Sequence, residues 1–147
     1  MNGALDRIIK EESARLIRNT PAEIGMVSTS KGELAALDIG VSPFDNSKTN
    51  KEDVSRTPKG VDRYALIFAY LGRKGYQIHV EYREGSQHSQ KDAPAFLRES
   101  VGYAKMITDK SILVSLDAGN DSLDNIAICI AEGVTWLIKR NLRRENV

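Results

Sequence analysis

The sequence predicts an α/β domain in which a mixed five-stranded sheet is flanked by helices. Three strand patterns follow a first helix as a meander, and two more strand patterns each come after a helix pattern. The chain of 147 residues is 41% hydrophobic and 28% charged, which suits a single globular core. Because parallel crossovers are right-handed, few topologies remain. We expect the strand order 3-2-1-4-5, with the first and fourth strands as parallel neighbours.

The first helix is predicted over residues 4–18, where apolar positions recur among charged ones, and Thr20-Pro21 stops it. Residues 1–20 therefore form an amino-terminal helix and linker region, ahead of a main domain over residues 33–147. Residues 33–41 are predicted as its first strand, apolar on both faces as a covered central strand would be. Asp38 interrupts that apolar run.

A polar connection is predicted over residues 42–63, and connections this long are more often functional than accidental. Strands over residues 63–71 and 76–83 follow, joined by four residues with glycine at both ends, which is typical of a hairpin. The second of these strands alternates, with Gln77, His79, Glu81 and Arg83 on the face expected to be wet.

The rest of the chain reads as two helix-strand units. Asp92 is expected to cap a helix, and residues 111–116 form the next strand. Asp121 or Ser122 caps a helix that ends at Gly133, before a last strand over residues 134–138. The apolar face of this last helix is expected at Leu123, Ile126, Ala127 and Ile130. Among α/β folds, this element order is shared by the ribonuclease H-like nucleotidyl transferases.

Composition excludes several classes of protein. With 21 basic and 20 acidic residues the net charge is +1, so the chain as a whole has no electrostatic attraction to nucleic acid or membrane. The single cysteine, Cys129, excludes a disulfide framework and a cysteine zinc site. No apolar run is long enough to cross a bilayer, so we expect a soluble intracellular protein without a membrane partner. His79 and His88 are too isolated to indicate a metal site. The aromatic residues of the strand patterns are expected in the core: Tyr64, Phe68, Tyr70 and Trp136.

Asp38 and Asp117 are the candidate catalytic and metal-binding residues. A carboxylate within an apolar strand is costly unless it is paired or binds a cation, although Asp38 also fits a solvated sheet rim. Asp117 ends a strand where ligand groups gather in α/β sheets, and a turn-forming role is the alternative. Asp121 and Asp124 are better explained as helix caps. Two carboxylates from separate strands are ligands suited to Mg²⁺ in phosphodiester chemistry.

Basic residues of the 42–63 connection and of the carboxyl-terminal tail are the candidate DNA-binding residues, and the alternative is that they are only solvated. They are Lys48, Lys51, Arg56, Lys59, Arg140, Arg143 and Arg144.

Four ordered blocks of the sequence resemble bacterial insertion-sequence transposases of the DDE type (transposase DDE domain, group 1-like). Residues 41–65 are similar to the segment after the first catalytic strand of that family, and residues 82–90 to its next shared block. Residues 113–122, LVSLDAGNDS, are similar to the strand bearing the second catalytic aspartate. Residues 138–145, IKRNLRRE, resemble the block that follows it.

The resemblance implies a ribonuclease H-like domain that cleaves transposon ends and joins them to target DNA with two Mg²⁺ (or Mn²⁺) ions. Asp117 matches the second aspartate of the family. The first is expected in a Leu-Asp-x-Asp pattern, but residue 40 is glycine, and Asp38 would be a substitute offset by about 7 Å. The family's third acid, a late glutamate, has no counterpart, since Glu145 lies only a few residues after the last strand. We therefore expect weak metal binding and an interior, truncated portion of a transposase that is inactive alone.

Two alternatives stay open beside this interpretation. One is a non-catalytic DNA-binding or regulatory remnant of a transposase, and the other is an unrelated small α/β enzyme. DNA, as transposon ends and target, is the expected partner, and homo-oligomerisation is left open. The resemblance implies a bacterial cytoplasmic, nucleoid-associated location.

Overall fold

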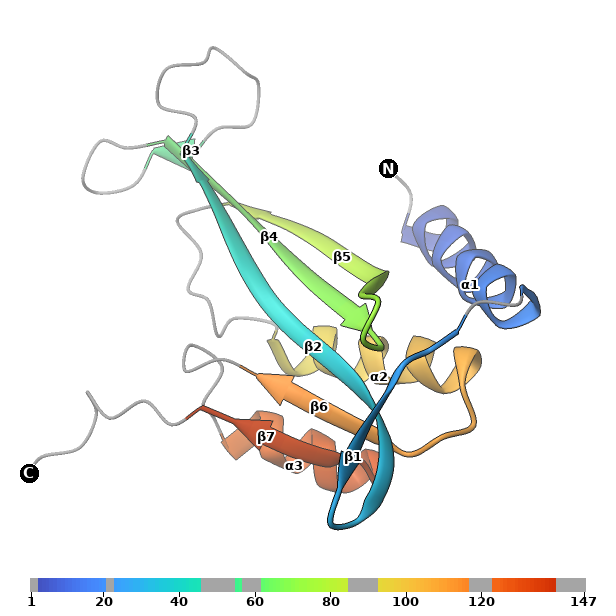
Figure 1. The fold of residues 1–147 in the computed structure, drawn as a ribbon. Helices are drawn as coiled ribbons and strands as arrows, with labels where there is room; N and C mark the ends of the chain where they lie inside the picture. Colours follow the sequence, from blue (N-terminus) through green and yellow to red (C-terminus); the bar gives the residue numbers. More distant parts are fainter. Residues whose placement is uncertain are drawn as a thin grey trace, which may run out of the picture.

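The computed structural model describes residues 3–20, 23–45, 55–56, 62–84, 93–116 and 123–139. Within these ranges three helices and a seven-stranded mixed sheet form an α/β unit (Figure 1). The helices are α1 (Gly3–Asn19), α2 (Ala93–Ile107) and α3 (Leu123–Glu132). The strands are β1 (Met26–Thr29), β2 (Gly32–Asp45), β3 (Ser55–Arg56), β4 (Asp62–Leu71), β5 (Tyr76–Glu84), β6 (Ile112–Leu116) and β7 (Thr135–Ile138).

The long strand β2 is the centre of the sheet. It pairs antiparallel with β4 on one side and parallel with β6 on the other. Strand β5 pairs antiparallel with β4, and β7 pairs parallel with β6, so the five main strands have the order β5-β4-β2-β6-β7. The parallel pairing predicted for the strands over residues 33–41 and 111–116 is confirmed.

Two short strands were not predicted, and the polar connection is shorter than expected. Strand β1 forms a hairpin with the start of β2, and β3 pairs with the first residues of β4. The pairing of β2 with β4 continues to Asp45 opposite Arg63, so the prediction of a connection from residue 42 was wrong at its beginning. Backbone pairing extends these strands although their side chains include turn-forming residues.

Helices α2 and α3 cover the same face of the sheet, and α1 packs against α2 and β5 (Figure 1). We call this side the helix face; it carries Leu37, Ile39 and Val114, all buried. The alternating residues of the same strands, Asp38, Gly40 and Ser115, lie on the opposite side, which we call the open face. Asp38 is exposed there, so the prediction that the first strand is covered on both faces was wrong.

A β-bulge explains a second correction. Strand β4 aligns Tyr70 with Gln77 but Ala69 with His79, which leaves Ile78 as an extra residue in β5. Gln77 and His79 therefore point to opposite faces, whereas strict alternation would place them on one face. His79 belongs to the helix face and is only 2% exposed, so the prediction of a wet face containing it was wrong.

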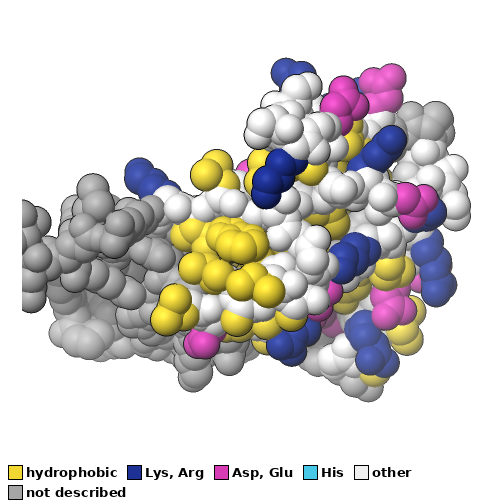
Figure 2. Space-filling model, turned by 90° about the horizontal axis from the view of Figure 1, so that it is seen from below, with side chains coloured by type: hydrophobic (Ala, Val, Ile, Leu, Met, Phe, Trp, Pro, Cys, Tyr) yellow, Lys and Arg dark blue, Asp and Glu magenta, His cyan; other side chains and the backbone are white. Residues whose placement is uncertain are grey.

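Helix α3 buries a different side from the one predicted. Its buried residues are Asn125, Ile128 and Cys129, while Leu123 and Ile130 of the expected apolar face are 83% and 62% exposed. On neighbouring β7, Trp136 and Leu137 are exposed too, which corrects the core placement expected for Trp136. Figure 2, which views the molecule from the end with α3 and β7, shows hydrophobic side chains gathered on this surface.

Gly133 ends α3 as predicted, with a positive φ of 68° that suits glycine. None of the described helices has the length and apolar character needed to cross a membrane.

Candidate functional site

The candidate site predicted from the sequence centres on Asp38, in the middle of β2. Asp38 is level with Tyr70 of β4 and with Ser115 of β6 in the sheet register. Its chain neighbours Leu37 and Ile39 are buried on the helix face and fix the strand, while the carboxylate itself is exposed. The fold thus holds a solvated acid on a rigid central strand. Such placement is compatible with both a cation ligand and a solvated surface carboxylate.

Gly40 occupies the next position on the same face, about 7 Å further along the strand. It is level with Phe68 of β4. A Cβ atom added to Gly40 would meet no neighbouring atom within 4 Å, so there is space for a larger side chain. A larger side chain, an acid included, can therefore be accommodated at position 40, where this chain carries glycine.

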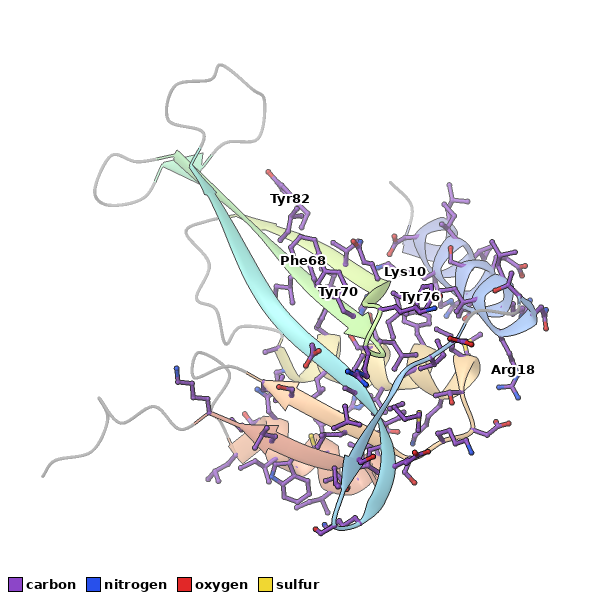
Figure 3. The ribbon with its side chains drawn as sticks, viewed as in Figure 1. Lys10, Arg18, Phe68, Tyr70, Tyr76 and Tyr82 are labelled. Carbon is purple, nitrogen blue, oxygen red and sulfur yellow. The ribbon has the colours of Figure 1, made fainter. Side chains whose placement is uncertain are left out.

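Aromatic side chains border this part of the open face. Phe68 and Tyr70 stack along β4, with ring centroids 5.7 Å apart and an interplanar angle of 20° (Figure 3). Both are half-buried, which corrects the core placement expected for them. Half-exposed aromatic rings beside a carboxylate offer a surface on which a planar group can stack.

Most of the other predicted site residues fall outside the described part of the chain. Arg56 is described only as backbone in β3. The remaining ones lie outside the described residues, as does the side chain of Tyr64: Asp117, Lys48, Lys51, Lys59, Arg140, Arg143 and Arg144. The structure therefore pairs β2, which carries Asp38, with β6, which ends one residue before Asp117. Asp117 itself and the side chains of the basic residues are outside what the structure describes.

A second polar cluster, not found by the sequence analysis, lies where α1, α2 and β5 meet. His79 stacks on Phe96 of α2, with centroids 4.2 Å apart and planes 7° from parallel. Its Nδ1 is 3.0 Å from Ser100 Oγ, and Ser100 Oγ donates a hydrogen bond to the Phe96 carbonyl oxygen at 2.7 Å. Its Nε2 lies 3.4 Å from Glu99 Oε2. The imidazole is thus held from one side and faces a carboxylate on the other.

Electrostatics keep this imidazole neutral at pH 7. Burial, and after it the Lys10 ammonium, lower the pKa of His79 to about 4, while Asp6 acts in the opposite sense. The pKa of Glu99 is raised by burial and then by the nearby Glu81 carboxylate. Because His79 is neutral, its contact with Glu99 is not an ion pair.

A pocket of about 210 Å³ opens beside His79. Its lining includes Asp6, Lys10 and Ser13 of α1 together with Gln77 and His79 of β5. Lys10 Nζ is 2.7 Å from Asp6 Oδ2, so part of the lysine charge is compensated within the helix. In Figure 3, Lys10 is labelled where α1 approaches β5.

The sequence did not reveal this cluster because its geometry depends on the bulge. His79 and Glu81 stand two residues apart on one strand, a spacing that places them on a common face. Which face they share depends on the β-bulge at Ile78, and no residue of the sequence indicates that a bulge occurs there. Glu99 comes from α2, and only the packing of that helix brings it near.

Comparison with models of protein families, and with curated proteins, found no match.

Proposed function

We propose that this chain acts in DNA transposition, as part of a ribonuclease H-like domain of a DDE-type transposase. The observation that carries the proposal is the parallel pairing of β2 with β6, which sets Asp38 level with Ser115, two residues before Asp117. The strand order β5-β4-β2-β6-β7, with α2 and α3 on one face, supports the same fold.

The register gives the proposed site its detail. The pairing between β2 and β6 ends at Ile39 and Leu116, and the next residues along the chain are Gly40 and Asp117. The proposed site therefore lies where β2 and β6 cease to pair, at the carboxyl end of β6, where α/β sheets usually hold ligands. Asp38 lies on the same face of β2 as position 40, one two-residue repeat or about 7 Å earlier.

The donor set at this place does not fit a two-metal centre. Mg²⁺ and Mn²⁺ sites of that kind require several carboxylates at closely defined distances, and here Gly40 contributes none. Asp38 with Asp117 would bind one ion weakly, so we assign no step of phosphodiester transfer to this chain. We propose that its own contribution is to bind DNA through the basic residues of the 42–63 segment.

The test is a salt series of gel shifts with double-stranded DNA. We expect weak, sequence-tolerant binding by the native chain that is lost as salt rises. The test variant replaces four basic residues with glutamine: Lys48, Lys51, Arg56 and Lys59. The matched control replaces four others: Lys31, Arg73, Lys74 and Lys110. We expect the test variant to lose binding and the control to keep it, and equal retention by both variants would contradict the proposal.

A cleavage assay distinguishes two interpretations of the chain, a catalytic portion of a transposase and a non-catalytic remnant of one. Because Gly40 leaves the metal site incomplete, we expect no strand transfer and at most trace nicking by the native chain with Mg²⁺, since misplacing a catalytic group by ~1 Å can cost about a hundredfold. Robust Mg²⁺-dependent cleavage would contradict the inactive, DNA-binding form of the proposal and restore a catalytic role.

A further inference from the structure

His79 presents a buried nitrogen lone pair toward two carboxylates. Ser100 has one hydroxyl hydrogen, and the hydrogen-bond network assigns it to the Phe96 carbonyl oxygen. Ser100 Oγ must then accept from His79, so the imidazole proton is on Nδ1. Nε2 is left as an acceptor, is buried, and has no hydrogen-bond partner among the described residues.

The groups in front of this nitrogen are the carboxylates of Glu81 and Glu99. One oxygen from each and His79 Nε2 all lie within 4.8 Å of one another. In a tetrahedral Zn²⁺ site with metal–ligand bonds of about 2.1 Å, the ligand atoms lie about 3.4 Å from one another, so the most widely separated pair needs to approach by up to about 1.4 Å. The Glu99 side chain is 52% exposed and has the freedom to make that movement.

The hydrogen bond between Nδ1 and Ser100 also fixes the orientation of the imidazole, so that Nε2 stays directed toward the carboxylates. A neutral imidazole whose other nitrogen is fixed by a hydrogen bond is the usual form of a histidine metal ligand.

We propose that His79, Glu81 and Glu99 form a binding site for a divalent transition-metal ion such as Zn²⁺. One imidazole nitrogen with two carboxylate oxygens suits Zn²⁺ and its neighbours in the series better than Mg²⁺, which prefers oxygen ligands alone. The exposed side of Glu99 leaves coordination positions for water. This site lies on the helix face and is distinct from the Asp38 region on the open face.

The test is calorimetric titration of the untagged chain with Zn²⁺, with circular dichroism of every variant to verify folding. We expect one equivalent of Zn²⁺ to bind and Mg²⁺ not to compete at equal concentration. Glu99→Gln removes a half-exposed ligand and should weaken binding at least tenfold, whereas Glu33→Gln, an exposed glutamate outside the cluster, should have no effect. Ser100→Ala leaves all three ligands in place but frees the imidazole, and should weaken binding about tenfold or more.

The two histidines of the chain supply a further matched pair. His79→Gln should abolish binding and His88→Gln should leave it unchanged. A folded Glu99→Gln variant that binds Zn²⁺ as tightly as the native chain would overturn the proposal, and so would loss of binding on His88→Gln or Cys129→Ala alone. These measurements do not depend on DNA binding, so the proposed metal site can be contradicted without contradicting the proposed function, and the reverse.

Discussion

The two faces of the sheet differ in how far their polar side chains are exposed to solvent. On the open face, Asp38 stands exposed beside half-buried aromatic rings. On the helix face, His79 is buried and is held by a stacked ring and a hydrogen bond. Leu37 and Asp38 are adjacent in sequence yet belong to these different environments. Burial on the helix face therefore contributes strongly to stability, and an exposed residue of the open face such as Asp38 can be exchanged with little effect on folding.

The largest expected effect comes from the adjacent pair Leu37 and Asp38. Leu37 is 0% exposed, and Leu37→Ala should lower the free energy of unfolding by about 3 kcal/mol because it leaves a cavity under β2. Asp38→Asn should change it by less than about 0.5 kcal/mol, as exposed substitutions usually do. Urea denaturation measures both. A loss above about 1 kcal/mol for Asp38→Asn would mean that the open face is not as independent of folding as we argue.

The second prediction concerns acidification. His79 has its pKa lowered from 6.5 to about 4 in the folded protein, so between these values the unfolded chain binds more protons. The free energy of unfolding should therefore fall as pH drops, by about 2 kcal/mol between pH 7 and pH 5. Asp6, Lys10, Glu81 and Glu99 all face this imidazole, and the raised pKa of Glu99 acts in the opposite sense near its own range.

Urea denaturation at the two pH values tests this, with His79→Gln expected to remove most of the difference. Direct titration of the imidazole by NMR provides the same answer if that variant does not fold. An imidazole that titrates near 6.5 in the folded chain would show that burial does not act on His79 as described.

The smallest expected effect is on the exposed surface of α3. Ile130→Glu should change the free energy of unfolding by less than about 0.5 kcal/mol, because this side chain is 62% exposed. Ile128→Ala, two residues earlier on the buried face, should cost about 2 kcal/mol or more. Thermal melting compares the two. A strong destabilisation by Ile130→Glu would mean that the apolar surface seen in Figure 2 is covered in solution.

The order of the main strands was predictable from the sequence because it depends on the succession of elements and the handedness of crossovers. The five strands over residues 33–41, 63–71, 76–83, 111–116 and 134–138 all occur, with small differences at their ends. The side-chain directions were less predictable. The sequence placed Asp38 on the correct strand. In β5, however, a bulge at Ile78 interrupts the alternation of side chains, and no residue type there indicates a bulge.

The orientation of α3 was wrong for a related reason. The stripe from Leu123 to Ile130 has helical spacing and is more apolar than the opposite side, yet packing against α2 and the sheet buries Asn125 and Cys129 instead. Tertiary contacts here outweigh the simple apolar pattern. The same contacts assemble the His79 cluster, whose members come from two elements separated in sequence.

The measurement closest to the central claim is Mn²⁺ titration of the open face. It is done in the Glu99→Gln background, so that the cluster on the helix face does not contribute. We expect weak binding by this chain, lost on Asp117→Ala, and at least tenfold tighter binding after Gly40→Asp, which adds a carboxylate to the proposed site at a position where there is space for it. Equal binding with and without Asp117, and no gain from Gly40→Asp, would contradict the assignment of this sheet to a transposase metal site.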